Sequence, residues 1–394
     1  MDLEERKARA RLAIDEASAS LREVNLAIHG KPELNFEEHH AHQVLTDYLD
    51  AAGFDVERGA YGMPTAFKAV AGSGSPTIAV ICEYDALPGI GHACGHNLIA
   101  VCGVAAGLAL KACVAEGEGT ILVLGSPAEE GGGGKIVMVE RGAFDGVDAA
   151  MMAHPAPREA AYMNVLAVEH VNIEYRGQNA HAAAAPWDGV NALDAMILAF
   201  SNIGLMRQQM LPSDRVHGVI TQGGVKPNII PDYTAAEFYI RARRKAELDV
   251  LRKKVMGCFE GAATATGCTL AFLQTEDQRP YSDMVANDVL AELYTENLGI
   301  LGIRVPGKQQ VLAGPGGSTD MGDVSYTVPS IHPMFAIPTE AGNHTAGFTA
   351  AAATQAAHDA AMRTAKSLAM TALDVVATPE LLDSMKREFA EMRR

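Results

Sequence analysis

The chain has 394 residues, of which 48% are hydrophobic. This is more than one compact core usually covers, so we expect two folded domains and little disorder. The formal charge of −16 and the pI of about 5.2 argue against nucleic acid or an anionic membrane surface as a partner, because both bind clustered lysine and arginine.

The N-terminal residues are largely charged, and the sequence has no uninterrupted apolar segment of about 20 residues. We therefore expect a cytoplasmic protein with no membrane partner. The six cysteines are too sparse for a disulfide framework in a chain of this length, and a reducing compartment would leave them free.

The first elements in the chain are predicted to be helices. Apolar residues recur at three- and four-residue steps over 14–28, which predicts an amphipathic helix ending near Gly30. A second helix is expected to be capped by Asn35, with Glu38 three residues later, and to end at Gly53.

Two short apolar runs follow at 77–82 and 120–124, separated by a helical stretch at 97–115. The pattern predicts buried parallel strands joined by a crossover helix. A third strand-like run, 147–153, ends at His154. We therefore expect an α/β domain with a mostly parallel sheet, whose ligands bind at the carboxyl ends of the strands.

The pattern changes near Glu169, where apolar and polar residues begin to alternate. The predicted order is then strand, helix, strand, strand, helix, strand, with the last strand at 269–275, and this βαββαβ order is typical of a ferredoxin-like unit. From 280 the chain returns to long helices and short apolar runs. We place the first domain at 1–168 and 280–394, interrupted by an inserted domain at 169–279.

Two glycine-rich segments partly match the motifs of P-loop proteins and serine hydrolases, but neither match is complete. The run at 131–134 precedes a lysine, but Glu129 and Ile136 occupy the places where a P-loop needs Gly and Ser or Thr. The segment 316–320 has Asp320 where a nucleophile elbow needs its second glycine. The sequence therefore argues against P-loop and serine hydrolase chemistry.

Cys94 and His96 follow the first strand. An i, i+2 pair in extended backbone points both side chains to one side, so the two could reach one ion, and thiolate and imidazole are zinc ligands. The structural alternative is that Cys94 packs at a helix N-terminus and that His92 and His96 are polar loop residues.

Glu129 and Glu130 directly follow the second strand. Two adjacent carboxylates repel each other when buried, unless a cation or a proton lies between them. In extended backbone they diverge, so one could coordinate a metal while the other acts as a general base. The alternative is a pair of solvated acids at the start of the next helix. His154 and His344 also lie where strand-like runs end, which gives four such clusters.

These motifs, in order and over nearly the whole chain, resemble the M20 family of metallopeptidases and amidohydrolases, in its aminoacylase-like branch. The matching segments are 28–34, 85–88, 92–97, 127–130, 180–183, 228–232 and His344. The segments 83–92 and 318–325 are most similar to the group that contains β-alanyl-lysine type dipeptidases and p-aminobenzoyl-glutamate hydrolases.

The resemblance implies a zinc-exopeptidase-like catalytic domain, with the inserted ferredoxin-like domain as a lid that also forms a homodimer or higher homo-oligomer. It implies two divalent ions, zinc or manganese, with cobalt as a further candidate. The implied ligands are Cys94, His96, Glu130, His154 and His344, with Cys94 bridging the ions. Glu129 is then the general base, and Asp85 orients a ligand. Many M20 enzymes have a histidine ligand where this chain has Glu83. This difference leaves open whether the second metal ion binds more weakly, is absent or is a different element.

The inserted domain is expected to contribute to substrate binding. By the resemblance, His181 or His217 stabilises the oxyanion, from the same or a neighbouring subunit; the alternative for His217 is a cross-strand surface residue. Arg241 and Asn228 are expected to bind the product carboxylate, and the alternative for Arg241 is a pair with Glu237. In the other domain, Ser318 is assigned to substrate binding.

We therefore predict a metal-dependent hydrolase that cleaves the amide of a dipeptide or N-acyl amino acid, in which Glu129 takes a proton from metal-bound water. One alternative is a p-aminobenzoyl-glutamate-type or other aromatic N-acyl amino acid amidohydrolase. Alternatives of other classes are a non-catalytic metal- or metabolite-binding protein and a thiol enzyme that uses Cys94 with His96.

Overall fold

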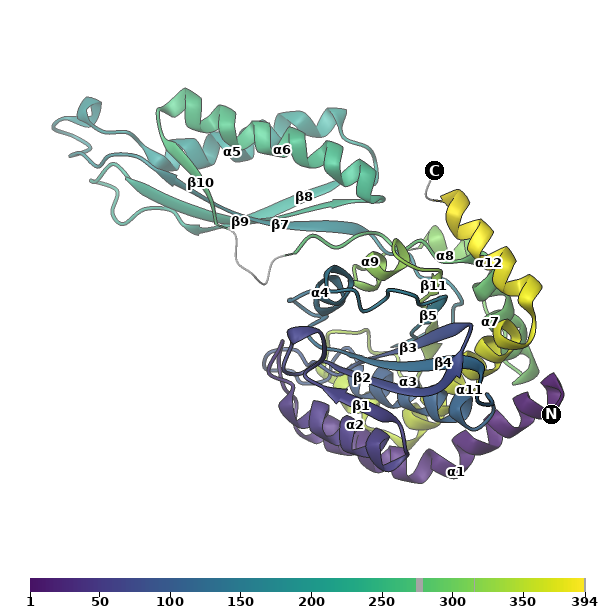
Figure 1. Ribbon diagram of the computed structural model, residues 1–394. Coiled ribbons are helices and arrows are strands. Elements are labelled where there is room, and N and C mark those ends of the chain that lie inside the picture. Colours follow the sequence, from purple (N-terminus) through teal and green to yellow (C-terminus); the bar gives the residue numbers. More distant parts are fainter. Residues whose placement is uncertain (274–278, 315, 393–394) are drawn as a thin grey trace. The chain divides into compact units, whose positions relative to one another are not determined.

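A computed structural model describes residues 1–273, 279–314 and 316–392. The chain forms two compact units (Figure 1). Met1–Asn164 and Met284–Arg394 make up the large unit, and Val165–Asp283 is the inserted unit. None of the helices in the described ranges is long and apolar enough to cross a membrane.

The helices of the large unit are α1 (Leu3–Gly30), α2 (His39–Ala51), α3 (His96–Lys111), α4 (Gly134–Glu140), α7 (Asp288–Ile300), α8 (Lys308–Leu312), α9 (Met321–Ser325), α10 (Ala346–Ala352), α11 (Gln355–Ala377) and α12 (Pro379–Met392). Its strands are β1 (Asp55–Arg58), β2 (Phe67–Gly74), β3 (Thr77–Glu83), β4 (Glu118–Ser126), β5 (Ala149–Met151), β6 (His154–Ala156), β11 (Ser330–Ile331) and β12 (Met334–Ala336).

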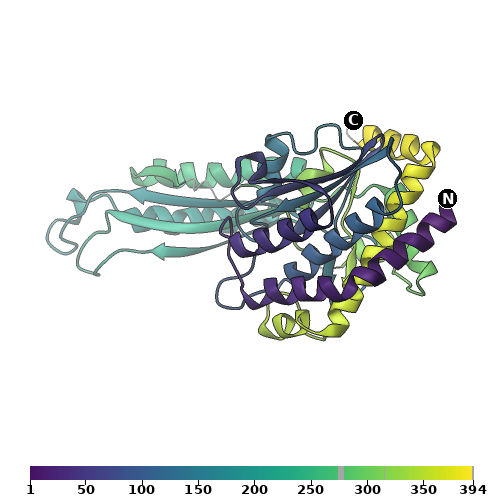
Figure 2. The ribbon, with the colours of Figure 1, turned by 60° about the horizontal axis from the view of Figure 1, so that its bottom comes forward.

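The large unit is a three-layer α/β structure. Its main sheet has the order β1-β2-β4-β3-β5-β11, in which β3, β4, β5 and β11 are parallel and β2 is antiparallel to both of its neighbours. One face packs on α3, with α1 and α11 behind it, and the other packs on α4 and α9 (Figure 1). In Figure 2, the purple helix α1 lies on the outside of its layer.

Alternating side chains explain the two cores. Ile78 and Val80 of β3 belong to the cluster that includes α1, α3 and α11, while Ala79 and Ile81 belong to the cluster on the other face. Because successive strand residues point to opposite faces, a strand covered on both sides must be apolar throughout. The apolar run at 77–82 is therefore a central strand, as predicted, and α3 is its crossover helix to β4.

The inserted unit is ferredoxin-like. Its elements in chain order are β7 (Ala167–Arg176), α5 (Ala192–Met206), β8 (Arg215–Gln222), β9 (Tyr233–Ala242), α6 (Lys245–Thr266) and β10 (Thr269–Leu273). The sheet has the order β10-β7-β9-β8, all neighbours antiparallel. Both helices cover one face (Figure 1). The predicted fold class is confirmed; the predicted strand end at 274–275 lies outside the described residues.

The predicted cap of the second helix is wrong. Helix α2 begins at His39, and Glu38 precedes it without a side-chain cap. The Glu38 carboxylate is instead buried and accepts hydrogen bonds from the backbone N–H of Phe36 and Ala128, at 3.0 and 2.9 Å, and from the Thr65 hydroxyl, at 2.8 Å. A long-range contact to the loop after β4 thus replaces the local cap.

Candidate metal centre

The parallel strands end level with one another at one edge of the main sheet. Glu83, the last residue of β3, pairs with Ser126, the last residue of β4. The chain then continues to Asp85 from β3 and to Glu129 and Glu130 from β4. The edge therefore gathers side chains that lie far apart in sequence, as open α/β sheets do at their ligand sites.

All five predicted metal ligands come together there. The ligand atoms of Cys94, His96 and His154 lie within 4.8 Å of one another, and so do those of Cys94, Glu130 and His344. Cys94 belongs to both groups, which is the arrangement that a bridging ligand requires. Sulfur, imidazole and carboxylate donors together suit zinc and similar borderline ions.

The two buried histidines each direct their Nε2 toward this space. His96 Nδ1 donates to Asp85 Oδ1 at 2.7 Å, and no hydrogen-bond partner of its Nε2 is described. His154 Nδ1 donates to the Pro155 carbonyl at 2.8 Å, which leaves its Nε2 as an acceptor 3.3 Å from Cys94 Sγ. Metal-binding histidines typically have one nitrogen fixed in this way. The donor set therefore fits a metal ion.

The Asp85 carboxylate orients two parts of the site through hydrogen bonds. Its second oxygen accepts the backbone N–H of Glu130 at 2.9 Å, so one carboxylate orients both His96 and the loop after β4. Burial alone would raise the pKa of Asp85, but His96 and these hydrogen bonds outweigh it and lower the pKa. Asp85 remains charged and keeps the His96 ring in place.

Glu129 and Glu130 lie in a turn and not in extended backbone, and their side chains do not diverge fully: a carboxylate oxygen of each lies within 4.8 Å of the other and of His96. Ala128 has a φ of +56°, a left-handed conformation that is costly for alanine. Glu130 Oε2 lies 3.5 Å from His344 Nε2, while Glu129 lies near Glu83. Burial, then Glu83 and Glu130, raise the pKa of Glu129 well above its usual value. A carboxyl that readily takes a proton suits a general base.

The pair Cys94 and His96 is also not extended. Gly95 has a φ of +79°, and His96 begins α3. A Cβ at Gly95 would lie 2.6 Å from Pro155 Cγ, so glycine is needed both for the conformation and for the close packing. The two side chains converge because of this turn at the start of the helix.

A loop before α10 brings in His344. The backbone N–H of His344 donates to the Ala93 carbonyl at 2.8 Å, and Asn343 Nδ2 donates to the Pro155 carbonyl at 3.1 Å. His344 itself has a φ of +64°. The loop is thus tied to the two segments that contribute Cys94 and His154. Ser318 is half-buried in the loop before α9, outside these ligand groups.

Three fully buried residues at this edge were not identified from the sequence. Lys135, in the first turn of α4, pairs with Glu83 and with Asp320 Oδ1, the latter at 2.7 Å. His332 follows β11, and no hydrogen-bond partner of either ring nitrogen is described. In the sequence, Asp320 serves to exclude a nucleophile elbow, and no sequence pattern indicates that its side chain is buried beside a lysine.

Two of the predicted residues in the inserted unit lie in adjoining loops. The His181 and Asn228 segments are joined by the hydrogen bond from the Ala182 N–H to the Asn228 carbonyl, at 3.1 Å. His181 is exposed, and its Nδ1 accepts the backbone N–H groups of Ala183 and Ala184. Its Nε2 is therefore the nitrogen that carries the proton.

The other two lie on the sheet face opposite α5 and α6. His217 of β8 pairs with Tyr239 of β9, and the guanidinium of Arg241 lies 5.5 Å from the centre of the Tyr239 ring. His170 stacks on the same ring at 3.8 Å. His217 is an exposed cross-strand residue of the kind the alternative described, and burial followed by Arg241 lowers its pKa.

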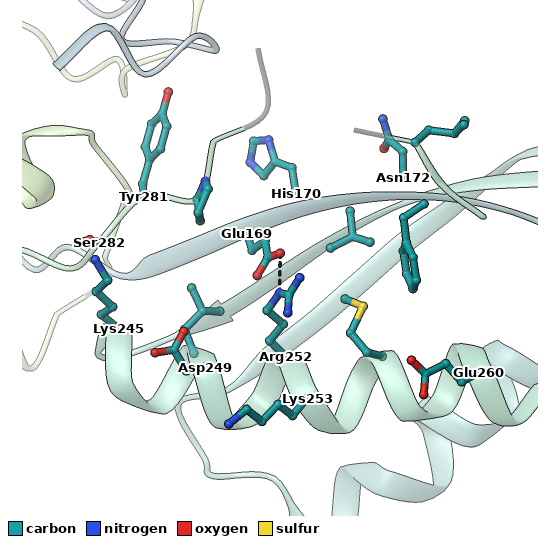
Figure 3. A pocket seen from close by; sticks show the side chains of 16 residues that line it. Glu169, His170, Asn172, Lys245, Asp249, Arg252, Lys253, Glu260, Tyr281 and Ser282 are labelled. Carbon is teal, nitrogen blue, oxygen red and sulfur yellow. Dashed lines mark hydrogen bonds and ion pairs between the residues drawn. The ribbon is translucent and has the colours of Figure 1, made fainter. Parts of the chain in front are cut away.

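The inserted unit also has a cavity of about 750 Å³, to whose lining His170 belongs (Figure 3). It lies along α6 and the start of β7, where Arg252 Nε contacts Glu169 Oε1 at 2.7 Å. None of the predicted site residues lines it.

The surroundings of Cys94 disfavour the thiol alternative. Burial, and then the nearby Glu130, raise the pKa of the Cys94 thiol well above its usual value. A nucleophilic cysteine needs a lowered pKa and a positive neighbour, whereas a bound cation deprotonates a ligand thiol directly.

The fold and the donor set define a metal-dependent hydrolase of peptide or other amide bonds, and the comparisons with known proteins agree. Residues 169–265 match the family of peptidase dimerisation domains. The chain is 49% identical to the Xaa-Arg dipeptidase of Mus musculus, over 98% of this chain and 93% of the relative. It is 29% identical to a p-aminobenzoyl-glutamate hydrolase chain of Escherichia coli, over 92% and 90%.

The YXEP protein of Bacillus subtilis, whose crystal structure is described as a dinuclear metal binding peptidase from the M20 family, superposes with a TM-score of 0.70 at 19% identity, over 92% of this chain and 99% of that one. The chain belongs to the M20 peptidase family. It is a hydrolase, so the alternative of a non-catalytic binding protein does not hold.

Proposed function

We propose that the chain is a dipeptidase that removes a carboxyl-terminal basic residue, such as arginine, with two divalent ions held by Cys94, His96, Glu130, His154 and His344. The observation that supports the metal centre most directly is the pair of ligand groups that share Cys94. The substrate class is supported by the Xaa-Arg dipeptidase at 49% identity, and the charge of −16 is compatible with a basic substrate.

The ions would supply Lewis-acid activation of water and of the scissile carbonyl. Glu129 takes a proton at its carboxylate and passes it to the leaving amine, and burial, followed by Glu83 and Glu130, raises its pKa in the direction that favours proton uptake. Asp85 keeps the His96 ring oriented through the 2.7 Å hydrogen bond to Nδ1. Glu130 stays ionised because His344 and His96 lower its pKa against the effect of burial.

The inserted unit is proposed to complete the site. His181 or His217 would stabilise the oxyanion, and Arg241 and Asn228 would bind the substrate carboxylate. Ser318 would contact substrate from the large unit. The match to a peptidase dimerisation domain supports a homodimer, in which a neighbouring copy of the chain could contribute His217. Light scattering after gel filtration tests the dimer; a monomer at micromolar concentration would contradict it.

A substrate panel tests the activity. The panel contains Xaa-Arg, Xaa-Lys and Xaa-Ala dipeptides, N-acetyl amino acids and p-aminobenzoyl-glutamate, because one relative is part of a p-aminobenzoyl-glutamate hydrolase. We expect the highest kcat/KM with Xaa-Arg, loss of activity in chelator and recovery on adding Zn²⁺, Mn²⁺ or Co²⁺. Activity that persists after complete metal removal would refute the metal centre, and a preference for p-aminobenzoyl-glutamate would replace the substrate class.

A further inference from the structure

A second group of acids lies beside the proposed metal centre. Ligand oxygens of Glu83, Glu129 and Asp320 lie within 4.8 Å of one another, and all three side chains are buried. We call Glu83, Glu129 and Asp320 the acid cage. Carboxylates alone are the ligands that hard divalent ions such as Mn²⁺ and Mg²⁺ prefer, so the cage would suit a cation.

The cage already contains a cation of the chain itself. Lys135 Nζ pairs with Glu83 Oε1 and with Asp320 Oδ1, the latter at 2.7 Å, and the Lys135 backbone N–H donates to Asp320 Oδ2 at 2.8 Å. Lys135 is fully buried. Burial alone would lower its pKa, but Asp320, Glu83 and Glu129 outweigh that effect and raise it. The ammonium therefore remains charged.

The glycine-rich run before α4 explains how this lysine reaches the cage. A Cβ at Gly134 would lie 1.9 Å from the Pro127 carbonyl oxygen, and one at Gly132 would lie 2.4 Å from the Phe36 ring. Only residues without a side chain allow the start of α4 to approach the loop after β4 so closely. The run that fails as a P-loop thus places Lys135 next to Glu83 and Asp320.

Glu83 connects the cage to the metal centre. Its Oε2 lies 3.5 Å from His96 Nε2, the nitrogen that is proposed to bind metal, while its other oxygen contacts Lys135. A Glu83 carboxylate without Lys135 would be a free hard ligand, directly beside both the cage and His96. Lys135 holds it on the side of Asp320.

We propose that Lys135 is a positioning residue that takes the place of a metal ion: its ammonium occupies the acid cage, holds Glu83 and keeps divalent ions on the Cys94 side. This inference rests on the proposed metal centre. It explains why this chain can have Glu83 where many M20 enzymes have a histidine ligand, because the ammonium of Lys135 balances the charge of the Glu83 carboxylate.

Equilibrium dialysis against Mn²⁺, followed by metal analysis, tests the proposal on full-length protein. We expect Lys135→Met to bind one more Mn²⁺ per chain than the wild type, with a changed Mn²⁺ EPR spectrum. The double variant Lys135→Met with Asp320→Asn removes a cage ligand as well and should return to the wild-type count. Lys7→Met is the matched control, because it removes a buried lysine that pairs with Asp374 outside the ligand groups.

Each result decides between an internal cation and an ordinary ion pair. If Lys135→Met folds and binds as much Mn²⁺ as the wild type, the inference is wrong while the metal centre stands. If the wild type itself binds none, both fail. If Lys135→Met unfolds in chelator, circular dichroism during Mn²⁺ titration decides: refolding supports the proposal, and a chain that stays unfolded at saturating Mn²⁺ overturns it.

Discussion

Replacement of Glu129 by glutamine separates the general base from the ligands around it. The side chain keeps its shape, and the turn that carries it is held independently by the hydrogen bond from the Ala128 N–H to Glu38 and by that from the Glu130 N–H to Asp85. The Glu129 oxygen lies 3.9 Å from His96 Nε2. The variant therefore loses a proton acceptor without losing a support of the site.

The expected loss can be estimated from what a general base contributes. Such a group typically accelerates the reaction by about 10²–10⁴, so kcat should fall by that factor, about 3–5 kcal/mol of transition-state stabilisation. The thermal midpoint should not fall, because the neutral glutamine is free of the cost of a charged carboxylate that burial, and then Glu83 and Glu130, impose at this position and that raises the Glu129 pKa. Metal content should be unchanged.

Initial rates of Xaa-Arg hydrolysis under saturating substrate, together with metal analysis of the same samples, provide the measurement. Glu159→Gln is the control, since Glu159 is a half-buried acid that pairs with Arg363 at 3.4 Å and lies outside the ligand groups. A Glu129→Gln enzyme within tenfold of the wild-type kcat would refute the base assignment. Loss of one bound ion would instead make Glu129 a ligand.

Two further predictions concern stability and one concerns metal binding. Lys7→Met should lower the free energy of unfolding by about 3–5 kcal/mol, because it leaves the buried Asp374 carboxylate without its cationic partner at 2.6 Å and with only the hydrogen bond from Asn297 described. Gly95→Ala should abolish tight metal binding, since the added Cβ would lie 2.6 Å from Pro155 Cγ and φ is +79°. In metal-free protein, the pKa of Glu38 is raised from 4.5 to about 7 by burial and then by Asp85. The folded state therefore keeps a proton that the unfolded state has released, and stability should fall by up to about 3 kcal/mol as pH rises from about 4.5 to about 7. Glu38→Gln should remove that fall.

Urea unfolding and metal titration measure these effects, each against a matched change. Arg9→Met removes an exposed pair with Glu16 and should change stability by no more than about 1 kcal/mol. Gly30→Ala adds a Cβ with no atom within 4 Å and should retain metal. A pH profile of Glu38→Gln that runs parallel to the wild type would contradict the assignment to Glu38.

The sequence by itself determined the architecture and the chemical class. The spacing of apolar residues determined the architecture. Continuous apolar runs indicated that β3 and β4 are central strands, and the alternation of apolar and polar residues from Glu169 indicated a half-exposed sheet. The two patterns differ because a strand buried on both faces is apolar throughout, whereas one buried on a single face alternates. Metal-favouring residues after several strands then pointed to one edge. Strand direction is enough to place these residues at one edge, whereas the set of five ligands was named from the resemblance to the M20 family; the structure brings all five together.

The tertiary structure alone decided the backbone of the site and its buried charges. The sequence predicted extended backbone at Cys94 and Glu129, but Gly95 and Ala128 adopt positive φ, because packing against Pro155 and a hydrogen bond to Glu38 fix these turns. Asn35 and Glu38 looked like a local capping box, and only the fold shows Glu38 bonded to a residue 90 positions away. Lys135 had no distinguishing pattern, since a charge after a glycine run is ordinarily solvated; its meaning depends on two acids, Glu83 and Asp320, that only the folded chain brings to it.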